Sequence, residues 1–220
     1  MTAADFPFRN RRHAGRVLAQ QLDAYAGRHD LVVLALPRGG VAVGFEVAHA
    51  LQAPLDVFIV RKLGMPGQEE YAIGAIASGG VRVLNPRSSV PAKVLAEVTA
   101  REQAELARRE QQYRGERPLP PLQDRCVIVV DDGLATGSTM RAAVLAIRQH
   151  KPSKIVVAVP VGAPMVCELL RKDADDVVCA ASPVPFRAVG LAYEDFPQAS
   201  DLEVRTLLEA ARLERALETH

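Results

Sequence analysis

Short runs of branched apolar residues alternate along the chain with segments in which apolar residues recur every three or four positions. Four such runs predict buried parallel strands, at 31–36, 55–60, 126–130 and 155–159. Apolar spacing of helical period predicts helices at 14–25, 41–51, 140–147 and 204–211. Ser200 and Glu203 have the spacing of a capping box before the last of these helices. The alternation predicts an α/β fold with a central, mostly parallel sheet flanked by helices.

One long segment, about 64–121, interrupts this alternation. It begins with a glycine-rich stretch and continues with a charged stretch in which Arg101, Glu105 and Arg109 are spaced four residues apart. That spacing predicts an exposed helix, and the prolines at 118, 120 and 121 mark its end. An insertion of this length indicates either a lid over a functional site or a solvated surface hairpin and helix.

Composition and charge narrow the class of protein. Hydrophobic residues make up 49% and charged residues 24% of the 220 residues, with a formal net charge of +1. We therefore expect one globular domain over 1–220, with no bulk attraction to nucleic acid or acidic membranes. Apolar runs stay below the ~20 residues that a membrane span needs. The polar, basic first twelve residues do not resemble a secretory signal, and three widely spaced cysteines predict neither a disulfide framework nor a zinc site. We expect a cytoplasmic protein.

The strongest chemical signal is the segment 127–139, VIVVDDGLATGST. A buried strand ends in Asp131 and Asp132, a loop of small and hydroxyl residues follows, and a helix begins at once. Small side chains let the loop N–H groups approach an anion, and the helix adds its positive end. The two acids can accept hydrogen bonds from vicinal ribose hydroxyls or face a cation. We predict a ribose 5-phosphate site whose phosphate contacts Ala135, Thr136, Gly137, Ser138 and Thr139.

Other strand-to-helix motifs also carry paired aspartates. A Walker B strand requires a GxxxxGK[ST] partner, which this sequence lacks. A receiver domain places its acidic pair after the first strand, whereas here the pair follows about the third. A purely structural turn would not require thirteen positions to agree at once.

Two further strand ends carry residues suited to phosphate. Pro37-Arg38-Gly39-Gly40 follows the first strand, and Arg61-Lys62 follows the second. Alone, the first is a weak turn signal and the second could be exposed charge. Ligands of open α/β sheets bind outside the carboxyl ends of the strands. The three strand ends together therefore predict one phosphate-rich ligand.

These motifs resemble the site of type I phosphoribosyltransferases, which bind 5-phosphoribosyl-1-pyrophosphate (PRPP). The resemblance implies that Asp131 and Asp132 hold the ribose hydroxyls and that loop 135–139 holds the 5-phosphate. It also implies that pyrophosphate is bound by the residues that follow the first two strands, namely Arg38, Gly39, Gly40, Arg61 and Lys62. In the family the first of these loops frequently has a strained non-proline peptide bond, which we expect to follow Arg38. Gly133 departs from the family, which usually has an apolar residue there, and we expect a looser turn.

Nearly the whole chain also resembles a narrower bacterial and archaeal subgroup of these proteins. The shared features are FxxRRxAG at 8–15, RKLGxPGxxExAxGA at 61–75 and FxAVGxxYxDF at 186–196. The resemblance implies the family fold, with a small hood of C-terminal and N-terminal segments at about 180–198. The acceptor pocket would come from the hood, with candidates Phe186, Val189, Tyr193 and Asp195. Each of these could equally pack in the hood, and Glu69, Glu70 and Tyr71 of the lid could reach the site or be solvated.

The implied activity is a glycosyltransferase reaction of the pentosyltransferase type, in which an acceptor displaces pyrophosphate from C1 of PRPP. Mg²⁺ would bind mainly to substrate oxygens, with Asp131 and Asp132 contacting it partly through water. The acceptor could be a nucleobase, another amine or an alcohol. Two alternatives are a PRPP- or nucleotide-sensing binding protein of the same fold and a phosphoribosyl hydrolase. The sequence contains no DNA-binding motif, and a homodimer is common in similar proteins.

Overall fold

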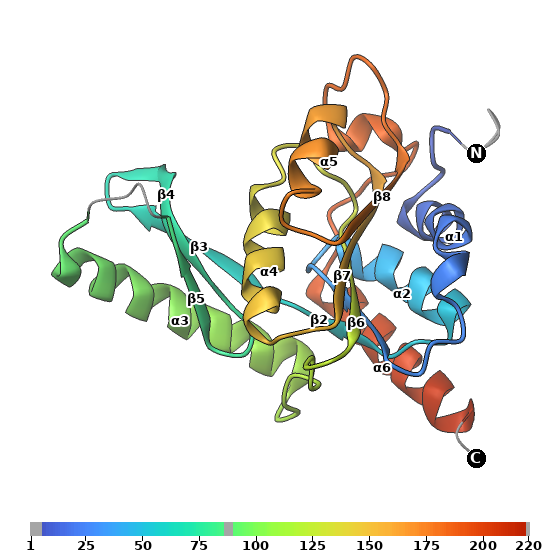
Figure 1. Ribbon diagram of the computed structural model, residues 1–220, viewed down its shortest axis with the longest axis horizontal. Helices are drawn as coiled ribbons and strands as arrows, with labels where there is room; N and C mark the ends of the chain where they lie inside the picture. Colours follow the sequence, from blue (N-terminus) through green and yellow to red (C-terminus); the bar gives the residue numbers. More distant parts are fainter. Residues whose placement is uncertain (1–5, 86–89, 219–220) are drawn as a thin grey trace.

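The computed structural model describes residues 6–85 and 90–218, with side chains left out at 69–72 and 218. Its centre is a five-stranded parallel sheet, which Figure 1 shows with helices on either side. The strands lie in the order β2 (Leu55–Val57), β1 (Leu31–Ala35), β6 (Cys126–Val130), β7 (Lys154–Val161) and β8 (Asp176–Ala181). All four pairings between neighbours are parallel. The predicted α/β fold is therefore confirmed. Ala35 lies opposite Val130, which brings the carboxyl ends of β1 and β6 to the same edge.

Helices cover both faces of this sheet. Leu31 and Val33 of β1 point to the face covered by α1 (Arg11–Gln21) and α2 (Gly40–Leu51). Val32 and Leu34 point to the opposite face, covered by α4 (Ser138–Gln149) and α5 (Pro164–Leu170). Each of these four side chains is at most 1% exposed. Burial on both faces explains why the strands read as continuous apolar runs rather than as alternating ones.

The strand predicted at 55–60 divides into two elements. β2 ends at Val57, where the Arg114 guanidinium donates a hydrogen bond to the Val57 carbonyl oxygen at 2.7 Å. The Ile59 N–H then donates to the Ser78 hydroxyl, and the chain enters β3 (Val60–Met65) of a second sheet. This small antiparallel sheet has the order β3, β4 (Gln68–Ala77), β5 (Val81–Leu84). Together with α3 (Ala92–Arg114) it projects from the central sheet (Figure 1).

The helix predicted to be exposed, α3, is buried along one stripe. Val98, Glu102, Leu106 and Tyr113 are each at most 8% exposed, and their spacing places them on one side of the helix. Val98, Leu106 and Tyr113 belong to the core formed with the small sheet and α6 (Asp201–Glu218). Outside this stripe, Glu105 pairs with Arg108 and Arg109, as the charged spacing of the sequence indicated.

The C-terminal part of the chain returns to the N-terminal helix. Ser200 caps α6 as predicted, because its hydroxyl accepts a hydrogen bond from the Glu203 N–H at 3.1 Å. Residues 182–199 follow the end of β8, overlap the predicted hood at about 180–198, and form the hood segment. They run beside the start of the chain, with a bridge between Phe8 and Tyr193. Tyr193 and Phe8 pack there in a separate small core with Val17 and Val161.

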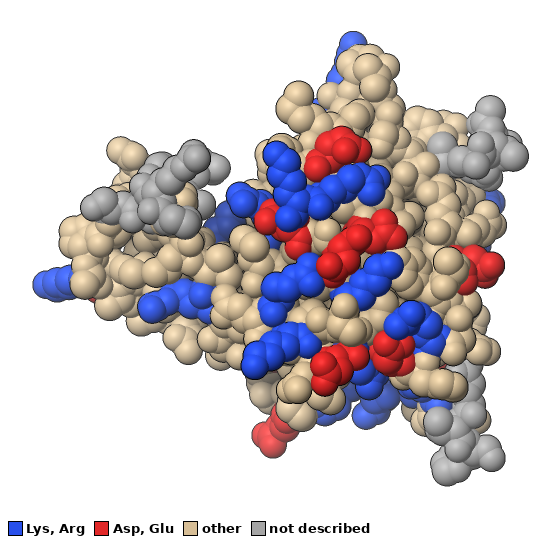
Figure 2. Space-filling model, in the orientation of Figure 1, with Lys and Arg blue, Asp and Glu red and all other residues tan. Residues whose placement is uncertain are grey.

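The outer surface carries charges of both signs. Figure 2 shows Lys and Arg interspersed with Asp and Glu on one face of the molecule. Arg141 of α4 pairs with Asp173 at 2.7 Å and Arg148 pairs with Asp175 at 2.9 Å. Among residues 6–85 and 90–218, helices that combine the length and apolar character needed to cross a membrane are absent.

Candidate functional site

The loop at 37–40, after β1, and the acidic pair Asp131 and Asp132, after β6, meet at the carboxyl edge of the central sheet. The Leu36 N–H donates to the Val130 carbonyl oxygen at 2.8 Å, which ties the end of β1 to the end of β6. A Cβ added at Gly39 would stand 1.9 Å from Oδ2 of Asp132, and one at Gly40 would stand 2.7 Å from the Val130 carbonyl oxygen. Two adjacent glycines are therefore required for the loop at 37–40 to pass this close to the acidic pair.

The structure corrects the position of the unusual peptide bond in this loop. The cis bond joins Pro37 to Arg38, so it precedes Arg38 rather than following it. The Arg38 carbonyl already accepts a hydrogen bond from the Val41 N–H at 3.2 Å, and Gly39 has helical dihedral angles. The bond that follows Arg38 thus belongs to the entry into α2. The Arg38 side chain lies 3.9 Å from Asp201 at the start of α6.

The two acids after β6 occupy different environments. Burial, reinforced by the charge of Asp132, raises the pKa of Asp131 well above its ordinary value. Oδ1 of Asp131 accepts a hydrogen bond from the Asp132 N–H at 2.8 Å. Oδ2 of Asp132 instead accepts one from Nε of Arg11 at 2.8 Å, and its backbone oxygen accepts one from the Tyr193 hydroxyl at 2.5 Å. Asp132 is therefore held from both sides, by α1 and by the hood segment.

Arg11 is a site residue for which the sequence suggested no role. Its guanidinium lies 3.7 Å from the centre of the Phe196 ring and donates to the Pro197 carbonyl at 2.7 Å. Only 12% of the Arg11 side chain is exposed. Arg11 and Phe196 belong to the sequence motifs at 8–15 and 186–196, so these motifs could have indicated them. Only the folded chain brings Arg11 to Asp132 and Phe196 to Arg11.

We expect Arg11→Met to weaken PRPP binding about tenfold, because Asp132 loses a charge-assisted hydrogen bond and the cation that fixes its orientation. Isothermal titration calorimetry measures the change. Arg12→Met is the matched control, because the neighbouring Arg12 pairs with Glu46 of α2 instead. Equal affinities of the two variants for PRPP would show that the contact of Arg11 with Asp132 does not serve the site.

The predicted phosphate loop is anchored at its base and open at its tip. The Leu134 N–H donates to the Val161 carbonyl at 2.9 Å, and the Leu134 carbonyl accepts from the Ala163 N–H at 3.0 Å. Beyond this bridge Ala135, Thr136 and Ser138 are exposed. Gly137 adopts a φ of +70°, which reverses the chain into α4 and offers no side chain to cap that helix. The N–H groups of the first turn are thus oriented to bind an anion.

Gly133 has a different role from the one expected. A glycine is not needed there for a left-handed conformation, because the φ angle of Gly133 is not positive. A Cβ at Gly133 would stand 2.5 Å from Cγ1 of Val189 and 3.0 Å from Cγ1 of Val161. The glycine therefore lets the hood segment approach the acidic loop, residues 131–133, rather than loosening the turn.

The two cations predicted after the second strand lie on the edge strand of the small sheet. Register places Arg61 opposite Ile76, on one face, and Lys62 opposite Ala75, on the other. A groove of about 320 Å³ along this edge is lined by Arg61, Lys62, Arg101, Glu102 and Thr139, among others. The last residue of the phosphate loop and both predicted cations therefore share one cavity. Arg101 and Glu102 were not anticipated, because the sequence indicated an exposed helix there.

Glu102 partly neutralises this groove. Its carboxylate accepts hydrogen bonds from Nη2 of Arg61 at 2.7 Å and from Nε of Arg101 at 3.1 Å. We expect Glu102→Gln to tighten pyrophosphate binding several-fold, because it removes a negative charge from the cavity. Calorimetry with pyrophosphate tests this, with Glu105→Gln, one turn further along α3, as the control. Weaker binding in Glu102→Gln would instead indicate that Glu102 serves mainly to orient Arg61.

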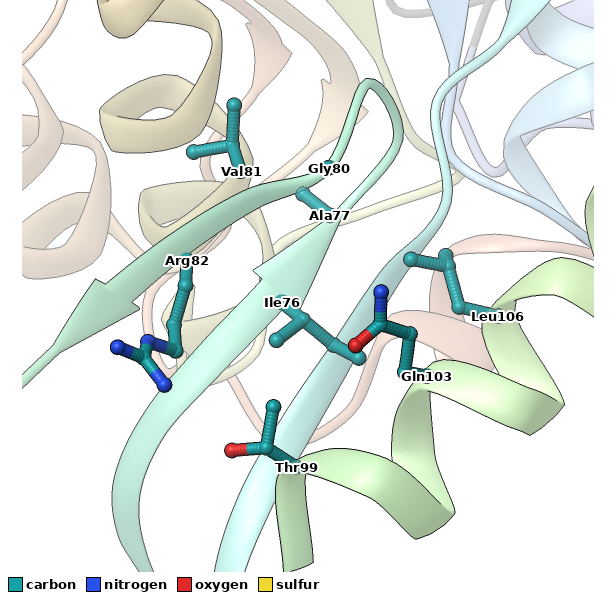
Figure 3. Close-up of a pocket in the computed structure, with 8 residues that line it drawn as sticks. All are labelled: Ile76, Ala77, Gly80, Val81, Arg82, Thr99, Gln103 and Leu106. Carbon is teal, nitrogen blue, oxygen red and sulfur yellow. The ribbon is translucent and has the colours of Figure 1, made fainter. Parts of the chain in front are cut away.

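A second cavity, of about 330 Å³, lies between α3 and the β4–β5 turn. Figure 3 shows Ile76 and Arg82 on the strands, with Thr99, Gln103 and Leu106 on α3. Its lining residues include none of the predicted site residues. It is therefore separate from the candidate site.

The predicted acceptor residues lie in different surroundings. Tyr193 is 6% exposed and its ring stacks on Phe196 at 4.6 Å, so it packs within the hood. Val189 is half-buried against Gly133, Phe186 is half-buried at the edge of the same small core, and Asp195 is exposed. Of the four, Val189 and Tyr193 contact the acidic loop. The side chains of Glu69, Glu70 and Tyr71 lie outside those described.

The side chains suited to hold a magnesium ion are the carboxylates that follow β6. Among the residues that the structure describes, clusters of three or more metal-ligating side chains are absent. Mg²⁺ usually keeps several waters and takes one or two carboxylates together with substrate phosphates. The adjacent carboxylates of Asp131 and Asp132 fit that requirement.

Comparison with known proteins identifies the family. Residues 9–195 match the phosphoribosyl transferase domain, so the chain belongs to the phosphoribosyltransferase family. It is 47% identical over 208 residues to proteins of two Mycobacterium tuberculosis strains named "Putative phosphoribosyl transferase". That alignment covers 93% of this chain and 47% of each relative, so the chain spans about half their length. The crystal structure of TT1426 from Thermus thermophilus is similar, with 44% identity, a TM-score of 0.83 and coverage of 91% of this chain and 97% of that one.

Proposed function

We propose that this protein transfers the 5-phosphoribosyl group of PRPP to an acceptor with release of pyrophosphate, in a reaction that requires Mg²⁺. The observation that carries the proposal is one juxtaposition. The paired acids Asp131 and Asp132, the open loop 135–139 and the glycines of loop 37–40 all meet at the carboxyl edge of β1 and β6. That edge is where open α/β sheets bind their ligands.

Each part of PRPP has a matching part of this site. The 5-phosphate would bind the exposed N–H groups and hydroxyls of loop 135–139. The ribose hydroxyls would donate to Asp131 and Asp132, with Asp132 held in place by Arg11. The pyrophosphate would contact the backbone at 38–40, together with Lys62 and Arg61 at the edge of the small sheet. Mg²⁺, when bound, would neutralise pyrophosphate oxygens.

In the reaction the bond from C1 to the pyrophosphate oxygen breaks while a bond from C1 to the acceptor forms. Holding the sugar at both its hydroxyls and its 5-phosphate keeps C1 in line between the two groups. Fixed cations at the pyrophosphate stabilise the charge that develops on the leaving group. The inserted segment at about 64–121 serves as a lid that excludes water from the reactive sugar cation.

The base of this lid is fixed to the rest of the molecule. Arg114 at the end of α3 pairs with Asp56 of β2 at 3.2 Å, and the Tyr113 hydroxyl donates to Asp201 of α6 at 2.5 Å. Movement would therefore be largest at the far end, where β3 and β4 meet. The hood segment supplies the acceptor pocket, with Val189 beside the acidic loop and with half-buried Phe186 and exposed Asp195 as further candidates.

Pyrophosphate release tests the proposal. The protein is incubated with PRPP, Mg²⁺ and a panel of nucleobases and amines. We expect release that depends on one acceptor class and is absent from the Asp131→Asn/Asp132→Asn variant. Pyrophosphate release without any acceptor would indicate a phosphoribosyl hydrolase instead of a transferase. PRPP binding without pyrophosphate release would indicate a PRPP-sensing binding protein. Absence of PRPP binding would overturn the proposal.

A further inference from the structure

Two of the three cysteines lie together beside the base of the phosphate loop. Cys167 is on α5 and Cys179 is on β8. A Cβ added at Gly162 would stand 2.7 Å from Sγ of Cys167 and 3.1 Å from Sγ of Cys179. The two sulfur atoms therefore flank the same glycine, whose missing side chain leaves room for them to meet.

The surroundings of the pair favour a thiolate on one sulfur and a thiol on the other. Hydrogen bonding from Cys179 lowers the pKa of Cys167 to about 7 against the opposing effect of burial, and Ser182 and Arg171 also lower it. The same hydrogen bond and burial raise the pKa of Cys179. The Ser182 hydroxyl donates to Sγ of Cys179 at 3.3 Å. A nucleophilic thiolate next to a second thiol is the arrangement found at redox-active cysteine sites.

We propose that Cys167 and Cys179 form an oxidation site at which a peroxide converts the two thiols into an intramolecular disulfide. The Cys167 thiolate attacks one oxygen of hydrogen peroxide, the O–O bond breaks, and a sulfenic acid and hydroxide form. The Cys179 thiol then attacks the sulfenic sulfur, the S–S bond forms and water leaves. Two thiols and one peroxide give one disulfide and two waters, and the two electrons pass from the sulfurs to the peroxide.

The low exposure of the cysteine pair limits the size of the oxidant that can reach it. Cys167 is only 5% exposed and Cys179 is half-buried, so the site admits a small peroxide more readily than a bulky disulfide. The third cysteine, Cys126, lies on β6 at 0% exposure and contributes to the core under α1 and α2. Burial raises the pKa of its thiol. Cys126 therefore provides a cysteine within the same protein that should not react.

The site adjoins the segment that positions the phosphate loop. Gly162 forms a bridge with Leu134, and a Cβ on Gly137 would stand 2.4 Å from Cγ1 of Val166, one residue before Cys167. A disulfide bond of about 2 Å is much shorter than a contact between two thiols, so its formation must draw α5 and β8 together. We expect this shift to weaken PRPP binding, an expectation that rests on the proposed function.

The first test is peptide mapping by mass spectrometry under non-reducing conditions, after treatment of the whole protein with hydrogen peroxide. We expect the loss of two hydrogens and a cross-link between the peptides of Cys167 and Cys179, reversed by a thiol reductant. Cys167→Ala and Cys179→Ala should abolish the cross-link, and Cys126→Ala should retain it. Recovery of both cysteines as thiols, as sulfinic or sulfonic acids, or only in links between molecules would overturn the proposal. The wild-type map decides the matter even where a variant fails to fold.

The second test compares PRPP affinity by calorimetry before and after oxidation. We expect the oxidised protein to bind several-fold more weakly and the affinity to return on reduction. A mapped disulfide with unchanged affinity would overturn the coupling to the phosphate loop. Absence of PRPP binding in the reduced protein would count against the proposed function instead, and the mass measurement would still decide the fate of the thiol pair.

Discussion

Replacing both Asp131 and Asp132 by asparagine should weaken PRPP binding by at least about 100-fold while the fold is retained. Asparagine keeps the shape of each side chain but removes the charge that makes hydrogen bonds to ribose hydroxyls strong. It also removes the carboxylates that can face Mg²⁺. Calorimetry with PRPP gives the affinity, and circular dichroism with thermal unfolding shows whether the fold persists.

The matched control removes two acids elsewhere. Asp173 and Asp175 lie before β8, pair with Arg141 and Arg148, and belong to none of the three segments of the site, 37–40, 61–62 and 131–139. Asp173→Asn with Asp175→Asn changes the net charge by the same amount. A similar loss of PRPP affinity in both double variants would attribute the effect to overall charge and would contradict the site.

Lys62→Met should weaken pyrophosphate binding by about 10- to 100-fold, the value of one lost hydrogen bond to a charged group. Lys62 lines the groove that also contains Thr139. Arg61 cannot fully substitute for it, because its guanidinium is paired with Glu102. Calorimetry with pyrophosphate measures the effect, and binding of ribose 5-phosphate should change little.

Arg82→Met is the control for this prediction. Arg82 lies opposite Ile76 in the small sheet, in the same cross-strand row as Arg61, and lines the separate cavity shown in Figure 3. The Arg82→Met substitution removes one positive charge from the same small sheet but leaves the groove lined by Lys62 and Thr139 unchanged. Equal effects of the two variants on pyrophosphate binding would mean that Lys62 acts only through the general field of the protein.

The central sheet could be predicted because its strands are buried on both faces. The continuous runs of branched apolar residues at β1, β6 and β7 are typical of strands buried on both faces, and few other elements have that pattern. β8 was missed because it begins with Asp176, and its residues Val178 and Cys179 are only half-buried at the edge of the sheet. The small sheet was missed because β4 has Gly74 in its interior and the four-residue β5 includes Arg82, so neither strand forms a continuous apolar run. Strand pairing of that kind is decided by packing against α3 and α4.

The candidate site divides in the same way. The acids and the phosphate loop are contiguous in the sequence, so the motif alone could indicate them. Arg11 and Tyr193 come from opposite ends of the chain, and their contacts with Asp132 exist only because the hood segment returns to α1. The same return brings Phe196 against the Arg11 guanidinium. The pairing of Arg61 with Glu102 likewise depends on α3 folding back over the small sheet.

A crystal structure of the protein with PRPP and Mg²⁺ tests the central claim most directly. We predict the 5-phosphate within hydrogen-bonding distance of the N–H groups at 135–139 and the ribose hydroxyls on Asp131 and Asp132. We also predict pyrophosphate between loop 37–40 and Lys62. A sugar phosphate bound at another edge of the sheet, or a loop around Thr136 that closes inward and leaves no room for an anion, would contradict the account.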